Sequence, residues 1–454
     1  MATWNVIHYT DIRPDRCDAE YFQPLYNENI KKLTMSDFVR LASLFSVIDR
    51  GEKAEYNESG NVPVLRSVNI RDLSFSDQRQ EFVTEDYYSK KTKGQVHKDD
   101  ILITSTGTGT LGRTSIWYKD SMAFNVPENS FLRGPLNVNP YFIATFLSTK
   151  FGVLQLFQNQ RGSSGQLHLY PVDIKRVVIP SFILDYQNEI GDTIKKAFVL
   201  EEESKSLYYQ AEELLAKELQ LDQLKLLNKK WYSTQYGEVL NRLRSDAEFY
   251  NPKLAQYYEH FSHIGLDMKC ICDFVKVKKF SNPTYAKEGL PIITQRHLSV
   301  ISPENYGDFP IADPNWCNKN TEAVLKKEDL LYYSVGAYLG KTNVWLNDDN
   351  AVFASFITLM RCKDVIDSCF LMLLLNSPFG ILQSKVFQSG TSQPYIYPKD
   401  IKQFLVPDIT RKRKEALFDL IHKSYSAMNQ SKQLLAQAKH RVEELIEQEA
   451  NKYK

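Results

Sequence analysis

The chain has 454 residues, 43% of them hydrophobic and 12% aromatic, which supports sizeable cores and excludes a mostly disordered protein. Its length indicates two or three domains. The 56 basic and 55 acidic side chains leave a net charge of +1, so any nucleic-acid site must be a local patch. Six scattered cysteines, no apolar leader and no apolar run near the ~20 residues of a membrane span predict a cytoplasmic protein.

The same pattern occurs twice along the chain. RCDAEYFQP at Arg16–Pro24 returns as RSDAEFYNP at Arg244–Pro252, 228 positions later. Four further pairs keep nearly this offset: Val62–Leu65 with Leu290–Ile293, Lys98–Leu102 with Lys327–Leu331, Leu111–Thr114 with Leu339–Thr342, and Tyr170–Lys175 with Tyr397–Lys402. The period is far longer than the ~20–50 residues of solenoid repeats, so a large domain is duplicated. Arg66–Asn69 and Thr294–His297 differ between the copies. Two similar scaffolds with different targets would show this, as would drift after duplication.

Each copy is predicted to begin with an α+β part. Short apolar runs between turn residues predict strands, and longer runs predict helices. The expected strands are Ile101–Thr104, Thr114–Tyr118, Val177–Ile179, Asn343–Leu346 and Phe356–Met360; the expected helices are Tyr141–Leu156 and Ser368–Leu375.

Each α+β part is followed by a long segment that is typical of a helix. We expect an N-terminal segment (1–15), domain 1 (16–184), a first long helix (185–232), domain 2 (233–407) and a second long helix (408–454). Heptad-like spacing in the second helix predicts a coiled-coil seam, formed by Met428, Leu435, Ala438, Val442 and Leu445. The first helix carries a broader apolar stripe. We therefore expect an α+β protein with two repeated domains separated by two antiparallel coiled-coil helices.

A glycine-rich stretch, GTGTLG at Gly107–Gly112, fits the G-x-G-x-x-G pattern of dinucleotide sites. Such a site needs a helix directly after the turn, and the following residues predict a strand instead. We interpret the stretch as a glycine-rich hairpin whose hydroxyls, on Ser105, Thr106 and Thr108, approach a phosphate backbone.

The sequence offers little for metal binding or catalysis. His260, His263, Cys270 and Cys272 are zinc-ligand types, but their spacing differs from that of the usual zinc fingers. Buried thiols and surface histidines are the favoured interpretation. The chain lacks a P-loop, a G-x-S-x-G motif and an aminomethyltransferase Asn-Pro-Pro-Tyr motif. We therefore expect no metal site and no catalytic activity in this chain.

Polar residues in the loops are the candidate DNA contacts. Paired loops, RGSSGQ from Arg161 and QSGTSQ from Gln388, precede the repeated Tyr-Pro anchor and carry small hydroxyls and amides suited to phosphate and base edges. Ordinary turns and solvated charges are the alternative. The expected DNA-binding residues are Arg66, Asn69, Arg71, Ser105, Thr106, Thr108, Arg113, Arg161, Ser163, Ser164 and Gln166 in domain 1, and Gln295, Arg296, Lys341, Ser389, Thr391, Ser392 and Gln393 in domain 2.

These duplicated blocks, each followed by a long helix, make the whole chain resemble a specificity (S) subunit of a type I restriction–modification system. The resemblance implies that each domain recognises one half of a bipartite, asymmetric double-stranded DNA site. The helices would set the spacer and dock two methyltransferase (M) subunits; two restriction (R) subunits can join. S-adenosylmethionine, ATP and Mg would be bound by those partners, and this chain would hold no cofactor.

Two other classes of protein fit parts of the pattern. A stand-alone DNA-binding regulator would use the same domains without M subunits, and salt-sensitive DNA binding by the isolated chain would favour it. A coiled-coil scaffold would bind proteins only. Apolar helix surface left uncovered after the two helices pair would indicate docked partners.

Overall fold

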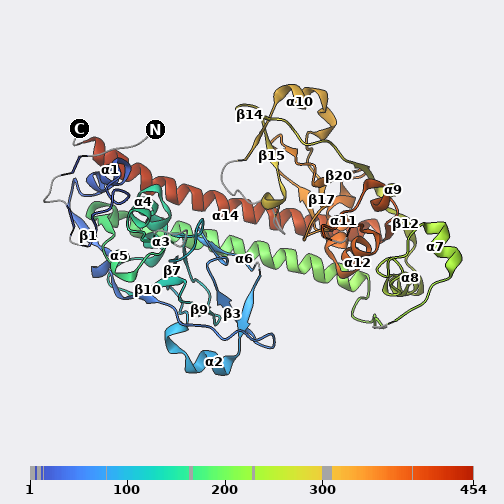
Figure 1. Ribbon diagram of the computed structural model, residues 1–454, viewed down its shortest axis with the longest axis horizontal. Helices are drawn as coiled ribbons and strands as arrows, with labels where there is room; N and C mark the ends of the chain where they lie inside the picture. The colour runs from blue at the N-terminus through green and yellow to red at the C-terminus, as the bar shows by residue number, and fades with distance from the viewer. Residues whose placement is uncertain are drawn as a thin grey trace. The chain divides into compact units, whose positions relative to one another are not determined.

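The computed structural model describes residues 6–7, 12–13, 15–77, 79–162, 167–227, 231–298, 309–390 and 392–452, without the side chain of Arg296. The chain divides into two compact units (Figure 1). Unit 1 comprises Met1–Val199 with Gln430–Lys454, and unit 2 comprises Leu200–Asn429. Each long helix contributes residues to both units. The expected division of the chain into domains remains a prediction.

The N-terminal segment of unit 1 has short strands and helices and leads into the first long helix, α6 (Gln187–Glu218), which continues into unit 2. Its elements are α1 (Pro24–Leu33), β1 (Phe38–Arg40), β2 (Phe45–Arg50), β3 (Val62–Leu65), β4 (Ile70–Arg71), β5 (Ser74–Phe75), β6 (Glu81–Val83), α2 (Glu85–Lys90), β7 (Ile101–Thr104), β8 (Thr114–Ile116), β9 (Phe124–Asn125), β10 (Asn129–Pro135), α3 (Pro140–Ser148), α4 (Lys150–Gln158), α5 (Pro171–Ile174) and β11 (Val178–Pro180).

Unit 2 repeats much of this order and leads into α14 (Arg411–Asn451). Its elements are α7 (Tyr236–Arg242), α8 (Lys253–His263), β12 (Met268–Cys270), α9 (Ile271–Phe274), β13 (Val275–Lys278), β14 (Tyr285–Ala286), β15 (Leu290–Ile293), β16 (Ile311–Ala312), α10 (Pro314–Lys319), β17 (Asp329–Tyr333), β18 (Thr342–Trp345), β19 (Val352–Phe353), β20 (Ile357–Cys362), α11 (Ile366–Asn376), α12 (Pro378–Phe387), α13 (Pro398–Ile401) and β21 (Leu405–Pro407).

The two units share one sheet topology. Unit 1 has an antiparallel sheet β2-β10-β7-β8, and unit 2 has its counterpart β13-β20-β17-β18. A second sheet in each unit contains one parallel pair, β3 with β9 and β15 with β19. Each unit also contains one short antiparallel pair of strands, β1 with β11 in unit 1 and β12 with β21 in unit 2. The duplication in the sequence is therefore a duplication of the fold.

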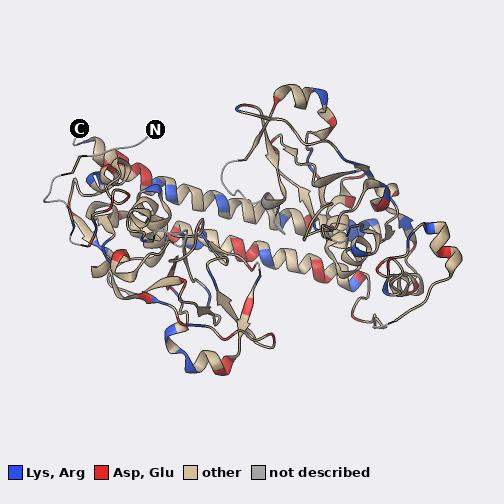
Figure 2. Cartoon of the chain, in the orientation of Figure 1, with Lys and Arg blue, Asp and Glu red and all other residues tan. Residues whose placement is uncertain are grey.

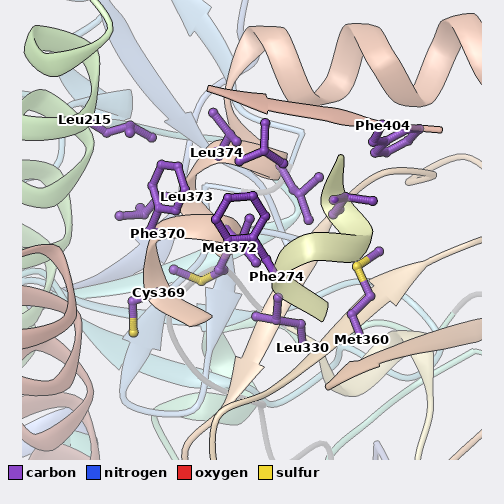
Figure 3. Packing of buried hydrophobic residues seen from close by; sticks show 14 of the residues in the cluster. Leu215, Phe274, Leu330, Met360, Cys369, Phe370, Met372, Leu373, Leu374 and Phe404 are labelled. Carbon is purple, nitrogen blue, oxygen red and sulfur yellow. The ribbon is translucent and has the colours of Figure 1, made fainter. Parts of the chain in front are cut away.

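The central strands are covered on both faces, which explains their continuous apolar sequence. In β7, Ile101 and Ile103 join one hydrophobic cluster, whereas Leu102 joins another with Trp117 and Phe131. Alternate side chains of a strand point to opposite faces, so both clusters are needed to bury it. In unit 2, α11 is buried from Ser368 to Leu375 and packs on this sheet (Figure 3).

The expected helix over 141–156 is two helices. α3 ends at Ser148, and the Thr149 hydroxyl accepts the Gly152 N–H at the start of α4. A Cβ at Gly152 would lie 2.4 Å from the Phe146 carbonyl oxygen, so the tight bend requires glycine here. Unit 2 has the same bend at Ser377, between α11 and α12.

The expected first long helix is too long at its C-terminal end, because α6 stops at Glu218. Gln220 adopts φ +47°, and the Leu221 N–H reaches back to the Ala216 carbonyl at 3.0 Å, which closes the helix. Leu219 is buried in the core of unit 2. The residues beyond Glu218 lack Gly and Pro and are rich in helix formers, which predicted more helix; instead the chain turns there and Leu219 packs into the core.

The two long helices pack against each other within each unit. In unit 2, Ser204 Oγ of α6 lies 3.1 Å from Ser424 Oγ of α14, and Glu218 pairs with Arg413 at 3.0 Å, so the helices are antiparallel there. In unit 1, the expected seam residues Ala438, Val442 and Leu445 are buried in the main cluster. Both helices carry charges of both signs along their length (Figure 2).

A buried ion pair recurs in both units and explains one repeated anchor. The Asp100 carboxylate accepts hydrogen bonds from Arg133 and from the His97 N–H, and Asp329 accepts the equivalent bonds from Arg361 and the Lys326 N–H. The preceding residue has positive φ in each copy. The Asp-Asp and Glu-Asp anchors are therefore structural.

Within the part of the chain that the structure describes, no single helix is long and apolar enough to cross a membrane. Only α11 and α12, taken together across a 73° bend, meet the length and composition test.

Candidate nucleic-acid interface

A glycine-rich turn joins β7 to β8 in unit 1. Gly107, Gly109 and Gly112 have φ values of +117°, +82° and +81°, a region that side chains other than glycine rarely adopt. β8 begins at Thr114, directly after the turn. The predicted hairpin is confirmed, and the helix that a dinucleotide site needs is not at this place.

The turn contacts the loop that precedes the repeated Tyr-Pro anchor. The Gly107 N–H donates to the Leu167 carbonyl at 3.3 Å, and Thr106 Oγ1 lies 3.3 Å from His168 Nδ1. Arg161 and His168 exchange two backbone hydrogen bonds of 2.8 and 2.7 Å, which close the loop. Two loops that are far apart in sequence thus form one polar surface in unit 1.

Unit 2 builds the same surface from different residues. The Gly336 N–H donates to the Pro394 carbonyl at 2.8 Å, and Val335 forms a bridge with Tyr395. Ser389 and Tyr395 exchange backbone hydrogen bonds of 2.8 and 2.9 Å. Gln295 Nε2 donates to the Val335 carbonyl at 2.7 Å, which joins a third segment to this surface.

Two arginines of the expected set meet beside the turn of unit 1. The β4–β5 hairpin holds Arg71 there, because the Leu73 N–H donates to the Thr114 carbonyl at 2.8 Å. Arg113 Nη2 donates to the Gly109 carbonyl at 3.1 Å. Burial and the neighbouring Arg71 charge both lower the pKa of Arg113. No ion pair with a carboxylate joins either arginine among the described residues, so the pair attracts an anion or the acceptor edge of guanine.

Several other expected contacts have a structural role in unit 1. Asn69 is fully buried and bonds the Arg66 N–H and the Ser76 carbonyl within its own hairpin. Ser105 is fully buried, with its Oγ 2.6 Å from Ser130 Oγ. Arg66 pairs with Glu81 at 3.7 Å. As placed, Asn69 and Ser105 present no side-chain group to DNA.

Arg161 is held by carboxylates. It pairs with Asp173, which is fully buried, at 2.8 Å and with Asp15 at 2.9 Å. Its hydrogen bonds to Asp173 raise the pKa of Arg161. We infer that Arg161 positions its loop. Ser163, Ser164 and Gln166 lie outside the described residues, whereas Thr108 is exposed at the tip of the turn.

The expected residues of unit 2 are only partly gathered. Gln295, Lys341 and Ser389 are half-buried on the surface described above, and Ser392 and Gln393 are exposed beside it. Thr391 and the side chain of Arg296 lie outside the described residues.

The sequence interpretation missed His168, Tyr338, Tyr395 and Arg50 on these surfaces, whereas Lys279 belongs to a basic run that it weighed as phosphate contacts. His168 and Tyr395 each stand two residues before the repeated Tyr-Pro anchor, and that shared position was the available signal. Tyr338 is exposed in the unit 2 turn. Lys279 Nζ lies 3.3 Å from Ser334 Oγ, and burial lowers the pKa of Lys279. Arg50 stacks over Tyr170 at 4.9 Å.

The weighed zinc-ligand set is divided, because His260 contacts one carbonyl and the two cysteines share another; both cysteines are half-buried rather than buried as expected. A ring nitrogen of His260 meets the Leu219 carbonyl at 2.9 Å, and the Sγ atoms of Cys270 and Cys272 lie near the Lys402 carbonyl. The residues that the structure describes contain no cluster of three or more ligand-type side chains able to hold a metal ion.

Part of the chain matches a family model, and most of it is similar to solved structures at low sequence identity. Residues 35–206 match the model of a family described as "Type I restriction modification DNA specificity domain". A type I restriction–modification S subunit structure from M. genitalium is similar at 14% identity and TM-score 0.44, over 90% of this chain and 94% of that one.

An HsdS subunit structure from Thermoanaerobacter tengcongensis is similar at 14% identity and TM-score 0.27, over 91% and 96% of the two chains. A structure titled for complex assembly and conformational transition of the type I R-M system is similar at 11% identity and TM-score 0.29, over 92% and 96%. The search of curated proteins gives no match.

Proposed function

Residues 35–206 carry a type I restriction–modification DNA specificity domain, and we propose that the whole chain is the DNA-recognition subunit of such a system. The observation that carries the proposal is the recurrence, in unit 2, of the strand order and joined loops of that domain. Each unit then recognises one half of a bipartite double-stranded DNA site.

The two half-sites differ, because the two surfaces carry different side chains. Unit 1 presents Arg71, Arg113 and His168, whereas unit 2 presents Gln295, Tyr338 and Tyr395. Arginine favours guanine O6 and N7, and amides favour adenine. One bidentate contact favours the correct base over a wrong one by only ~1–3 kcal/mol. Two linked domains, each recognising one half-site, are therefore needed to select a site within a genome.

The proposal assigns the chemistry to partner chains. The antiparallel helices α6 and α14 set the spacer and dock two methyltransferase subunits, with restriction subunits able to join. S-adenosylmethionine, ATP and Mg are bound by those partners, and this chain, acting on DNA in the cytoplasm, is not itself an enzyme. The near-zero net charge supports this division, since partner subunits would then supply part of the phosphate-binding surface.

A map of methylated adenine in host DNA, with and without this gene, tests the proposal. Loss of one bipartite, asymmetric motif on deletion is expected, and restoring the gene should restore that motif. A strain restored with the Arg71→Ala/Arg113→Ala variant should lose or relax the half-site of unit 1 and keep the other half-site. An unchanged map on deletion, in a host that methylates adenine, would contradict the proposal.

A further inference from the structure

Unit 1 contains a large open cleft, of about 1450 Å³, that the DNA-facing loops do not use. Its lining residues come from α1, the C-terminal end of α4, and the paired strands β1 and β11; Figure 1 labels α1, α4 and β1. Its apolar floor includes Phe22, Ile30 and Val178. Small-molecule pockets usually enclose ~300–1,000 Å³, so the volume and the open mouth suit a chain segment better than a metabolite.

Three unpaired cations stand on the cleft. Lys31, Arg40 and Lys175 line it and are exposed, and none makes an ion pair with a described carboxylate. The two other lining cations, Arg13 and Arg176, are each paired with Asp15 at 2.9 Å. Glu28 also lines the cleft, is exposed and makes no ion pair with a described cation, so the free charge there is three cations against one carboxylate and is net positive.

A buried hydrogen-bond acceptor also lines the cleft. Asn159 is only 6% exposed, and its Nδ2 donates to the Gln155 carbonyl at 2.8 Å. Its Oδ1 is buried and finds no donor among the described residues. A buried acceptor without a partner is unfavourable, so this oxygen favours an incoming N–H or O–H group.

Unit 2 closes the equivalent place. Gln155 and Gln383 make the same pair of backbone hydrogen bonds, to β11 and β21, which aligns α4 with α12. With that alignment Asn159 corresponds to Phe387, whose ring packs on Phe249 and Phe404 at centroid distances of 5.9 and 5.6 Å.

The cations change as well. By strand pairing Arg40 corresponds to Cys270, and by the repeat offset Lys31 corresponds to Glu259. Lys175 alone is retained, as Lys402. The cationic, amide-bearing cleft is thus particular to unit 1, although the scaffold is shared.

We propose that this cleft of unit 1 binds an acidic, partly apolar polypeptide segment of a partner protein. Carboxylates would pair with Lys31, Arg40 and Lys175, apolar side chains would cover the floor, and a backbone N–H would satisfy Asn159 Oδ1. DNA phosphate fits less well, because it brings no donor for that oxygen and no apolar group for the floor. None of the expected DNA-binding residues lines the cleft, although Asp15, which does, also pairs with Arg161 of the neighbouring loop.

Fluorescence anisotropy of a labelled peptide in which Glu and Leu alternate tests the proposal with the full-length protein. We expect saturable binding that Arg40→Glu/Lys175→Glu weakens about tenfold, since two ion pairs become repulsive contacts. Lys402→Glu is the matched control, because it reverses the equivalent charge in unit 2, and it should leave binding unchanged. Asn159→Phe, which introduces the residue that unit 2 carries, should also weaken binding; thermal melting checks that each variant is folded.

The outcomes separate the alternatives. A peptide with Lys in place of Glu should not bind, and duplex DNA should not compete with the acidic peptide. No binding of the acidic peptide, equal binding to the double variant, or displacement by duplex DNA would overturn the proposal.

Discussion

Replacing Arg71 or Arg113 with alanine is expected to weaken DNA binding without destabilising unit 1. Burial and the nearby Arg71 charge lower the pKa of Arg113, while the Asp72 charge opposes them, and neither arginine forms an ion pair with a described carboxylate. Removing one arginine relieves its repulsion with the other arginine in the free protein. In the complex, the same change removes an attraction to DNA. Binding and stability should therefore move independently, which separates these residues from structural arginines such as Arg133.

The magnitude depends on what each arginine contacts. If it contacts a guanine, alanine should reduce affinity by ~1–3 kcal/mol, about 5- to 150-fold, only for duplexes that carry the native base at one position. If it contacts a phosphate, alanine should weaken all duplexes alike. It should also reduce the slope of log affinity against log salt by about 0.9.

Anisotropy titrations with the complete subunit assembly, at several salt concentrations and with single-base variants of the target, measure both quantities. Lys32→Ala, which removes an exposed cation on α1, serves as the control and should leave both unchanged. Unaltered affinity and salt slope in both arginine variants, or a loss of thermal stability equal to the loss of binding, would refute the reasoning.

Three further predictions concern stability. Phe370→Ala should destabilise unit 2 by ~3–5 kcal/mol, measured by urea unfolding, because this ring is fully buried in the cluster of Figure 3; Phe370→Leu should recover much of the loss. Asp329→Ala should cost about 2–4 kcal/mol in the same assay, because Arg361 loses a bidentate partner but is partly exposed; an unchanged midpoint would contradict the assigned role. Hydrogen bonds from Arg244 lower the pKa of Asp246, so their stabilisation is present above the ordinary pKa of this carboxyl and is lost as pH falls through the lowered value. Acid unfolding of Asp246→Asn should accordingly show a shallower pH dependence than that of the wild type, and an identical acid limb would exclude this pair as a contributor.

The sequence determined the parts of the fold that depend on local pattern. The offset of 228 residues predicted two copies, and the structure shows the same strand order in both. Apolar runs predicted β7, β8, β11, β18 and β20, because short β-rich segments between turn residues have few alternatives. The heptad spacing located a buried seam at Ala438, Val442 and Leu445.

Long-range packing decided what the sequence pattern misjudged. The Gly- and Pro-free sequence beyond Glu218 looked helical, but Leu219 is buried in the core of unit 2, and the chain turns there. Ser105 looked like a DNA contact, yet it is fully buried and bonds Ser130 of β10, whereas Asn69 is held by hydrogen bonds within its own hairpin. A polar residue type does not state which way it points, since burial depends on segments distant in the sequence.

The candidate site, too, has features that the sequence predicted and features that only the tertiary structure shows. The sequence by itself determined that polar loops precede a repeated Tyr-Pro anchor, because composition and spacing are local. Only the tertiary structure joined these loops to the glycine-rich turn, placed His168 and Tyr395 at the junction, and set Arg71 beside Arg113. It also left the Asn159 Oδ1 atom without a hydrogen-bond donor in unit 1, whereas Phe387, at the equivalent position of unit 2, packs against Phe404. Such juxtapositions come from backbone pairing between distant segments, which no local pattern encodes.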